Sequence, residues 1–409
     1  MRRFAWVLLV LFVFTIPWEY SLVLPAPFGN IARIAGLATL AAAIPAVLLQ
    51  GRLRAPALLH WMVLALYLWW CCTGFWTIDA ASTDTKIRGN FQEMMIVWLI
   101  WEFVESAADL RTLLRAWLAG SWVLALLSLA NFASVDAAAA SQVRFAAAGQ
   151  DPNDVARFLA LGLPLAALLF RCERRWPIRW IAFGFLPVGL TAVLLTASRV
   201  GFVVAMVALA GSAVILGDGR AKAFALGILV TPAAIAGLWF FIPRGTLDRL
   251  ATIPAELQGG DLNQRVNIWS AGWDAFIRAP TRGAGAGAFV AAAHTAPIDT
   301  AHNTLLSIAV SGGLFAVFLA LTIVAAAAWL LAAMRGYLRI ALTTAMVVWA
   351  VTSLTATVEE SRTTWLLLGT IAVAARIAAE HEADFETCFK PLGAIAGTPC
   401  EADVVVVPQ

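Results

Sequence analysis

The sequence predicts an all-α protein that crosses a membrane many times, and three observations predict it. Hydrophobic residues make up 61% of the 409 residues, and charged residues only 13%. The mean hydropathy is +0.83. The apolar residues also fall into about twelve segments, each close to the length that an α-helix needs to cross the hydrocarbon core. A soluble domain is far more charged than this, and a disordered chain is far less hydrophobic, so both classes are excluded.

The first apolar segment, 4–24, resembles a secretory signal peptide at its start. It has no convincing A-x-A cleavage site, and many spans follow it, so we expect an uncleaved first helix. The other eleven predicted spans, in chain order, are 30–50, 56–76, 89–106, 113–133, 154–171, 177–197, 200–217, 221–243, 304–333, 337–357 and 362–380.

An even number of spans places both termini on one side of the membrane. The segments on that side hold sixteen of the 28 cations, mostly in short loops, which marks it as cytoplasmic. The predicted organisation is therefore spans one to nine in 1–243, one large periplasmic helical loop in 244–303, spans ten to twelve in 304–380, and a cytoplasmic tail in 381–409. The five cysteines show no CxxC or Cys/His spacing that would indicate a metal site.

The cations predicted outside the cell are unusual, because eleven of the twelve are arginines. The planar guanidinium binds carboxylate and phosphate groups through two parallel hydrogen bonds. An arginine-rich outer face beside a membrane therefore suggests an anionic, phosphorylated, lipid-linked substrate. Arg199 is notable because it lies in a very short turn between two apolar helices, where an arginine faces a cavity between helices. The alternative is that these arginines pair with lipid headgroups and with acids such as Asp248, Asp261 and Asp274.

The large loop predicts two helices, 246–257 and 262–278, separated by Gly259-Gly260. At 100° per residue, the second helix has an apolar stripe that contains Arg265, Trp269, Gly272, Trp273 and Phe276. An arginine on an apolar face is costly unless it is paired, so Arg265 is a candidate functional residue. The alternative is a side chain that extends to the lipid headgroups.

The sequence PTRGAGAGAF (280–289) follows, with glycines at every second position. It lacks the preceding strand and the G-K-[ST] of nucleotide-binding loops, so we expect a tight turn whose backbone approaches a sugar or a membrane helix. His302 and Asn303 then lie just before the tenth predicted span. The partial positive charge of a helix N-terminus disfavours imidazolium, so His302 is a candidate general base. It could equally cap the helix, and His294 is the competing base.

Four motifs, in this order, carry a resemblance to a family: RFAAAGQDPNDVARFLALGLP (144–164), TASRVGF (196–202), R-x3-W-x6-F with P-x-x-G-x-G-x-G-x-F (265–289), and H-N-x9-G (302–313). Together they resemble the O-antigen ligase and O-antigen polymerase superfamily of bacterial inner-membrane glycosyltransferases. Ligases carry R-x3-L and H-x10-G elements. His302 and Gly313 fit the second element, but Trp269 replaces the leucine of the first. Ala316 departs from the pattern of the protein-glycosylating relatives.

The resemblance implies a metal-independent, cofactor-free transfer on the periplasmic side of the inner membrane. The donor is a polysaccharide on undecaprenyl pyrophosphate, the acceptor is a sugar hydroxyl of lipid A–core, and membrane lipids but no nucleic acid are partners. We expect Arg199 and Arg265 to bind the pyrophosphate and His302 to act as base, with inversion at the anomeric carbon. The expected substrate-binding residues are Arg144, Arg157, Asn153, Asn303, Trp269 and Glu359.

Two other functions remain open. Polymerases of the same superfamily share the arginines but often lack this arrangement around the histidine, which favours a ligase. A transporter of lipid-linked oligosaccharides would also fit twelve spans. Transporters usually have repeated halves and charges near the membrane midplane, whereas this sequence shows no clear repeat and its charges cluster at the outer ends of the spans.

Overall fold

A computed structural model describes all residues except 26–27, 135–143, 218–243, 255–263, 297–298 and 390–409. The described chain is almost entirely helical, with one antiparallel pair of short strands, β1 (Val23–Leu24) and β2 (Gly29–Asn30). Within this part of the chain, nine helices are long and apolar enough to cross a membrane. The predicted class, an all-α polytopic membrane protein, is confirmed.

The nine helices include α1, which runs directly into a 3₁₀ segment at Pro17. Their bounds are α1 (Arg2–Thr15) with η1 (Ile16–Ser21), α2 (Ile31–Gln50), α5 (Ala107–Ser134), α6 (Pro152–Cys172), α7 (Trp176–Leu195), α8 (Arg199–Leu216), α14 (Thr304–Ala333), α15 (Gly336–Ser353) and α16 (Arg362–Glu380).

Three predicted spans differ from this set, so the count of twelve is not confirmed. The third, α3 (Leu58–Thr73), is apolar but has only 16 residues. The fourth is part of α4 (Ala80–Phe103), which begins nine residues before the predicted start because the Asp79 carboxylate accepts a hydrogen bond from the Ser82 amide at 3.0 Å. The predicted span at 221–243 lies outside the described residues.

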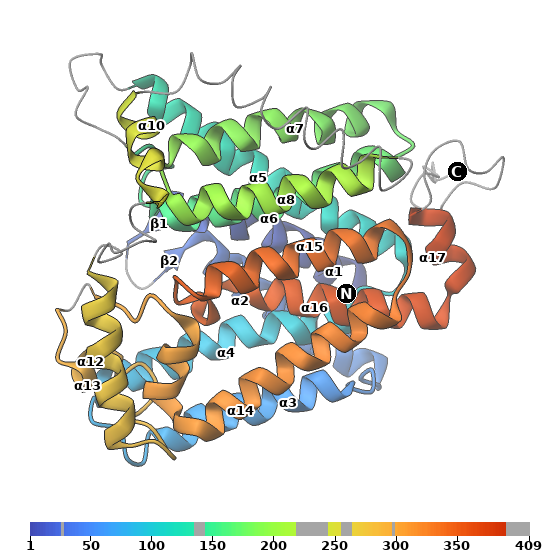
Figure 1. Ribbon diagram of the computed structural model, residues 1–409. Coiled ribbons are helices and arrows are strands. Elements are labelled where there is room, and N and C mark those ends of the chain that lie inside the picture. The colour runs from blue at the N-terminus through green and yellow to red at the C-terminus, as the bar shows by residue number, and fades with distance from the viewer. Residues whose placement is uncertain (26–27, 135–143, 218–243, 255–263, 297–298, 390–409) are drawn as a thin grey trace.

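The helices α6 and α16 form the centre of the bundle. Most of α6 is buried, and it packs against α5, α7, α8 and α15, while α16 packs against α4 and α14 (Figure 1). Both helices carry buried arginines, Arg157 in α6 and Arg376 in α16, and such side chains face protein rather than lipid. The helix α2 is the opposite case, since most of its surface stays exposed on the outside of the bundle.

The two ends of the bundle carry different structures (Figure 1). One end, called here the loop end, holds the β1–β2 pair and the short helices α10 (Arg244–Ala251), α12 (Arg265–Arg278) and α13 (Phe289–Ala293). The helix α17 (Glu382–Phe389) lies at the opposite end. The helix predicted at 246–257 is therefore found as the shorter α10, and residues 255–263, with the predicted glycine break, lie outside the described residues.

A small apolar core holds α12 and α13 against the first turns of α14. It includes Ile268 and Ala275 of α12 and Phe289 of α13. Gly272 permits this contact, because a Cβ there would lie 2.9 Å from the side chains of both Leu306 and Phe289. The packed face of α12 is thus centred on Ile268, Gly272 and Ala275. Trp273, which is also on the predicted apolar stripe, lies outside this packed face and is 55% exposed.

The glycine-rich loop docks into a break in α14. Gly313 has φ 68° and ψ −169°, which interrupts the helix and frees backbone groups on both sides. The loop then pairs with them: the Ala284 amide donates to the Val310 carbonyl at 2.8 Å, and the Leu314 amide donates to the Pro280 carbonyl at 2.8 Å. The expected close approach is therefore to a membrane helix.

Gly313→Ala tests this docking. Any side chain at Gly313 is strained at positive φ, and its Cβ would lie 2.3 Å from the Thr281 carbonyl oxygen. We expect a loss of about 2–4 kcal/mol in unfolding free energy, from backbone strain and overpacking together. The matched control is Gly336→Ala, since Gly336 also has positive φ (80°) but no atom within 4 Å of the added Cβ. Equal melting temperatures for the two variants would contradict the docking.

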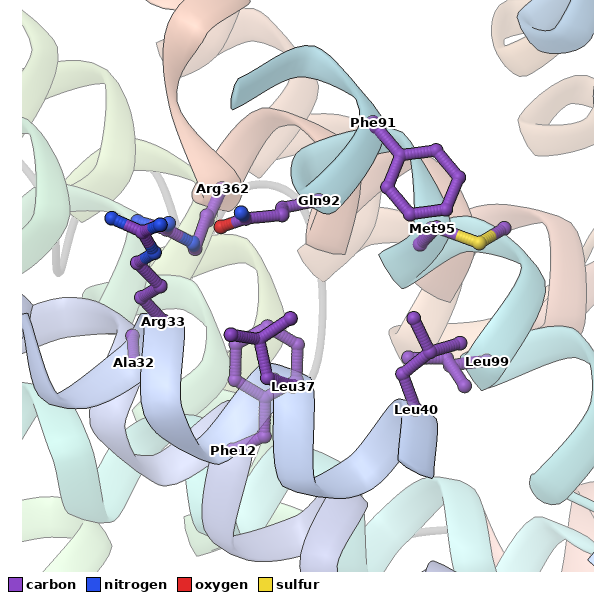
Figure 2. A pocket seen from close by; sticks show the side chains of 11 residues that line it. Phe12, Ala32, Arg33, Leu37, Leu40, Phe91, Gln92, Met95, Leu99 and Arg362 are labelled. Carbon is purple, nitrogen blue, oxygen red and sulfur yellow. The ribbon is translucent and has the colours of Figure 1, made fainter. Parts of the chain in front are cut away.

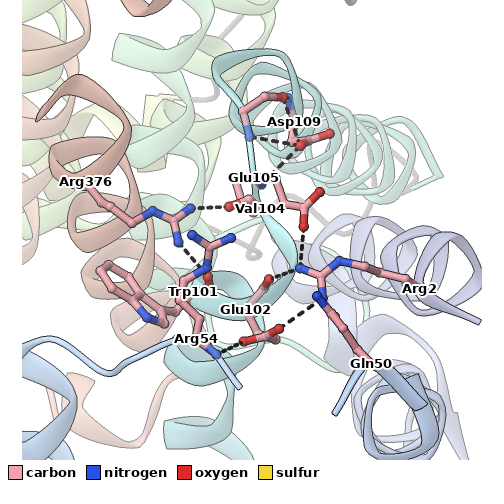
Figure 3. Close-up of polar contacts among 10 residues, drawn as sticks. Arg2, Gln50, Arg54, Trp101, Glu102, Val104, Glu105, Asp109 and Arg376 are labelled. Carbon is pink, nitrogen blue, oxygen red and sulfur yellow. Dashed lines mark hydrogen bonds and ion pairs between the residues drawn. The ribbon is translucent and has the colours of Figure 1, made fainter. Parts of the chain in front are cut away.

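The α17 end is held by a polar network between segments far apart in the chain (Figure 3). The Arg2 guanidinium pairs with Glu102 at 3.0 Å and donates to the Gln50 side chain at 2.6 Å. The other Glu102 oxygen accepts from the Arg54 amide at 2.9 Å. The network thus joins the start of α1, the end of α2, the segment before α3 and the end of α4.

Glu102→Ala is expected to lower the unfolding free energy by about 1–3 kcal/mol, because it removes the acceptor of several partly buried donors. The Glu102 side chain is 8% exposed, whereas that of Glu105, which also pairs with Arg2, is 53% exposed. Glu105→Ala is the matched control and should stay within about 1 kcal/mol of the wild type, as exposed ion pairs do. The check is thermal unfolding in detergent, and a larger loss for Glu105→Ala would contradict the prediction.

Candidate functional site

Four arginines gather around one aspartate at the loop end. They are Arg144, just before α6, Arg199 at the start of α8, Arg249 on α10 and Arg265 at the start of α12. Burial lowers the pKa of Arg144. The negative charge of Asp151 raises this pKa, whereas the positive charges of Arg249, Arg265 and Arg199 lower it further. The pKa of Arg265 is likewise lowered by burial first and by Arg199, while Asp151 raises it. The cluster carries a net positive charge.

Asn153 ties the arginine before α6 to the start of α8. Its side-chain oxygen accepts from the Arg144 guanidinium at 2.9 Å and from the Ser198 hydroxyl at 2.9 Å. Arg144 also donates to the Thr196 carbonyl at 3.2 Å. The helices can approach this closely because Gly201 faces Ala156, where a Cβ on the glycine would lie 2.3 Å away. Asn153 therefore positions the arginines.

Local capping fixes both helices of this pair. Asp151 caps α6 by accepting from the Asn153 amide at 2.7 Å, and Pro152 occupies the first helical position. Ser198 caps α8 by accepting from the Gly201 amide at 3.0 Å. Arg199 is the next residue, and it donates to the Arg249 carbonyl at 3.4 Å. The capping signals of the sequence thus set where both arginine-bearing segments begin.

His302 lies in a turn that neighbouring residues hold on both sides. Trp269 of α12 donates from its indole to the Ala301 carbonyl at 3.0 Å. Asn303 caps α14 by accepting from the Leu306 amide at 2.9 Å, and its amide group donates to the Leu354 carbonyl at 3.2 Å. His302 itself has φ 45°, a left-handed conformation that non-glycine residues seldom adopt. Such strain is found where the surroundings fix a residue for function.

The electrostatics of His302 link it to the arginine cluster. Burial lowers the pKa of the imidazole below its usual value, and the nearby charge of Arg265 lowers it further. Asp151, Asp299 and Asp154 act in the opposite direction with smaller effect. The imidazole is therefore neutral at pH 7, with a free lone pair that can accept a proton.

His294, the competing base, lies in a different place. It ends α13 and lines a surface cleft with Trp76, Arg278 and Arg282. Arg278 is the last residue of α12 and Arg265 the first, so this cleft is separated from the arginine cluster by roughly 20 Å, the length of a 14-residue helix. His294 thus lies far from the cluster that influences His302.

Of two further predicted substrate-binding residues, Arg157 is buried and Glu359 is half-buried. Arg157 is 4% exposed, pairs with Asp154 at 2.9 Å and donates to the Ser361 hydroxyl at 3.4 Å. Glu359 lies on η3 (Val358–Glu360), where burial raises the pKa of its carboxyl group to about 7 although the charge of Lys86 opposes this.

The helix η3 is fastened to the start of α14 through Thr304. The Thr304 hydroxyl accepts from the Val358 amide at 2.9 Å and donates to the Ala356 carbonyl at 2.8 Å. Lys86 of α4 forms an ion pair with Glu360 on the same short helix. Glu359 and His302 are thereby attached to the same helix end. In the part of the chain described here, no three His, Cys, Asp or Glu side chains are grouped so that they could hold a metal ion.

Sequence reasoning missed three charged residues of this region: Asp151, Arg249 and Lys86. Asp151 precedes Pro152 in a turn and could have been identified as a cap. Arg249 was counted among the external arginines, but nothing in its spacing separates it from the others. Lys86 lies on α4, outside the predicted span, and no local signal indicates that it pairs with Glu360.

The comparisons with known proteins agree with this geometry. A family model described as O-antigen ligase matches residues 183–321, which run from α7 through the arginine-bearing starts of α8 and α12 to His302 and the glycine break in α14. This part of the chain is therefore similar to the O-antigen ligase family. No curated protein matches the chain closely enough to add a relative. Members of the superfamily are glycosyltransferase-like enzymes that act on lipid-linked sugars.

Proposed function

We propose that the protein is an O-antigen ligase of the bacterial inner membrane. It transfers a polysaccharide from undecaprenyl pyrophosphate to a sugar hydroxyl of lipid A–core on the periplasmic side. The observation that carries the proposal is a cluster of four arginines at the loop end of the bundle, one of which, Arg265, acts on a neutral histidine, His302. This combination suits a reaction in which a pyrophosphate leaves and a hydroxyl loses its proton.

In this mechanism the arginines hold the donor. Arg265 and Arg199 contact the pyrophosphate, and Arg144 assists from the other side of the turn. Their donors bind oxygens whose negative charge increases as the sugar–phosphate bond breaks, so they stabilise the transition state more than the ground state. Because the guanidinium groups are partly withdrawn from water, their interaction with this charge is strengthened.

His302 acts on the acceptor. Its neutral imidazole takes the proton of the acceptor hydroxyl while that oxygen attacks the anomeric carbon from the side opposite the pyrophosphate. The bond between the anomeric carbon and the phosphate oxygen breaks, a new glycosidic bond forms, and the configuration inverts. The undecaprenyl pyrophosphate leaves as the anion. Trp269 and Asn303 hold the backbone on either side of His302 and act as positioning residues.

A bacterial host that lacks the gene provides the test. The measurement pairs a lipopolysaccharide gel with analysis of the lipid-linked intermediates. For a ligase we expect bare core on the gel and long polymer retained on the undecaprenyl carrier. Core that carries a single repeat unit would instead indicate a polymerase, and an unchanged ladder would overturn both assignments.

A further inference from the structure

A groove runs along the outside of the bundle between α2 and α4 (Figure 2). Leu37 and Leu40 of α2 form one wall, and Phe91, Met95 and Leu99 of α4 form the other. The Phe12 ring of α1 forms the floor, and it can do so because Gly36 has no side chain: a Cβ there would lie 3.0 Å from the ring. Leu37 and Phe91 are 45% and 41% exposed, so the groove faces the surroundings of the bundle.

One end of this groove is cationic. Arg33 and Arg362 come together there beside Gln92 (Figure 2). Arg362 is buried and forms an ion pair with Glu19, which also accepts from the Asn30 side chain at 3.1 Å. The guanidinium of Arg33 has no hydrogen bond or ion pair with any residue that the structure describes. Arg33 therefore adds a positive charge beside the paired Arg362 and Glu19, at the end of an apolar groove.

The cationic end adjoins the candidate active site. Arg362 follows Ser361, whose hydroxyl accepts from Arg157, and Arg157 pairs with Asp154. Asp154 in turn influences the pKa of His302. The end of the groove with Arg33 also lies next to Asn30 of β2, at the loop end of the bundle. A molecule in the groove would thus have its anionic head beside the arginine cluster and its chain along α2 and α4.

We infer that this groove holds the isoprenoid chain of the donor, a polyprenyl pyrophosphate, with Arg33 contacting its phosphates. The inference rests on the proposed function, because it names where the lipid of the proposed donor lies. The groove lies between α2 and α4, with the Phe12 ring as its floor. Its walls of Leu, Phe and Met bury hydrocarbon without unpaired polar groups, and Met95 adapts to an irregular chain. The exposed cation at one end complements the pyrophosphate.

Photolabelling of the full-length protein in nanodiscs tests the inference. The probe is a polyprenyl pyrophosphate with a diazirine in its chain, and labelled peptides are mapped by mass spectrometry. We expect labels on the groove faces of α2 and α4. Leu40→Trp fills the groove and should abolish this labelling. Leu48→Trp is the matched control, since Leu48 lies on the same helix, is 74% exposed and does not line the groove. Arg33→Gln should reduce labelling about tenfold, as loss of one charge-assisted contact does.

The possible outcomes distinguish a failure of the groove inference from a failure of the ligase assignment. Labelling that unlabelled undecaprenyl pyrophosphate displaces and phosphatidylglycerol does not would support the inference. Labelling displaced equally by phosphatidylglycerol, labelling only elsewhere, or labelling unaffected by Leu40→Trp would overturn it. The same samples are assayed for transfer to lipid A–core. Groove labelling without transfer would overturn the ligase assignment alone, and transfer without groove labelling would overturn the groove alone.

Discussion

Replacing His302 with alanine is expected to slow glycan transfer by about 10²–10⁴-fold, the usual loss when a general base is removed. The neighbouring structure should survive, because Trp269 and Asn303 hold the flanking backbone through Ala301 and Leu306 rather than through the imidazole. The loss should therefore fall on kcat, with little change in the KM for the donor. The measurement is the rate of transfer by the purified variant at saturating donor and acceptor.

The matched control for this substitution is His294→Ala. His294 is the other histidine of the loop end, and it also has positive φ (54°), yet it lies at the far end of α12 from the arginine cluster. Its variant should retain wild-type turnover. Near-normal turnover of His302→Ala, or an equal loss in both variants, would show that His302 is not the base.

The pH dependence of transfer gives a second readout on His302. The base must be neutral, so activity falls as pH drops through the pKa of the imidazole. Burial and Arg265 lower that pKa below 6.5, so the acidic limb of kcat/KM, which reports the free enzyme, should have its midpoint below pH 6.5. The limb should vanish in His302→Ala, whose residual activity no longer depends on this proton. A midpoint above pH 7 in the wild type would contradict the environment described for His302.

How much of this site the sequence could predict depends on the range of the interactions involved. His302 and Arg265 could be found because their signals are local: a histidine before a long apolar run and an arginine on an amphipathic helix. The role of Asn153 could not, because it depends on α6 meeting α8 where Gly201 faces Ala156. A capping or turn residue looks the same in sequence whether or not a distant arginine binds to it.

The exposure of Trp273 shows a second limit of sequence reasoning. Periodicity identifies an apolar face, but lipid is as apolar as a protein core, so hydrophobicity does not separate side chains that face protein from those that face outward. The packed face of α12 is set by Gly272, where close contact with Leu306 and Phe289 is possible. The small residue, rather than the largest aromatic, marks the contact. The helix α4 contains the predicted span 89–106, yet it buries Glu93 and is not among the helices of the described chain that are apolar enough to cross a membrane.

Arg265→Ala is expected to lower kcat by about 10²–10³-fold, comparable to the loss of one donor from a preorganised anion-binding site. Arg265 is partly buried within the field of Arg199 and Asp151, where few water molecules could replace it. Arg265→Lys should recover only part of the rate, because lysine keeps the charge but not the planar pair of donors. Arg88→Ala is the control, since the Arg88 side chain is 74% exposed and pairs only with Asp84 among the described residues. Its activity should be unchanged.

A second measurement on Arg265→Ala separates a direct role from general disruption. The positive charge of Arg265 helps to lower the pKa of His302, so its removal should raise that pKa and move the acidic limb of kcat/KM to higher pH. Arg265→Lys retains the charge and should leave the limb near its wild-type position. A variant that had only lost its fold would lose activity at every pH, without a change in the midpoint of the acidic limb. If Arg265→Ala keeps both its rate and its limb, the arginine neither binds the pyrophosphate nor sets the state of the base.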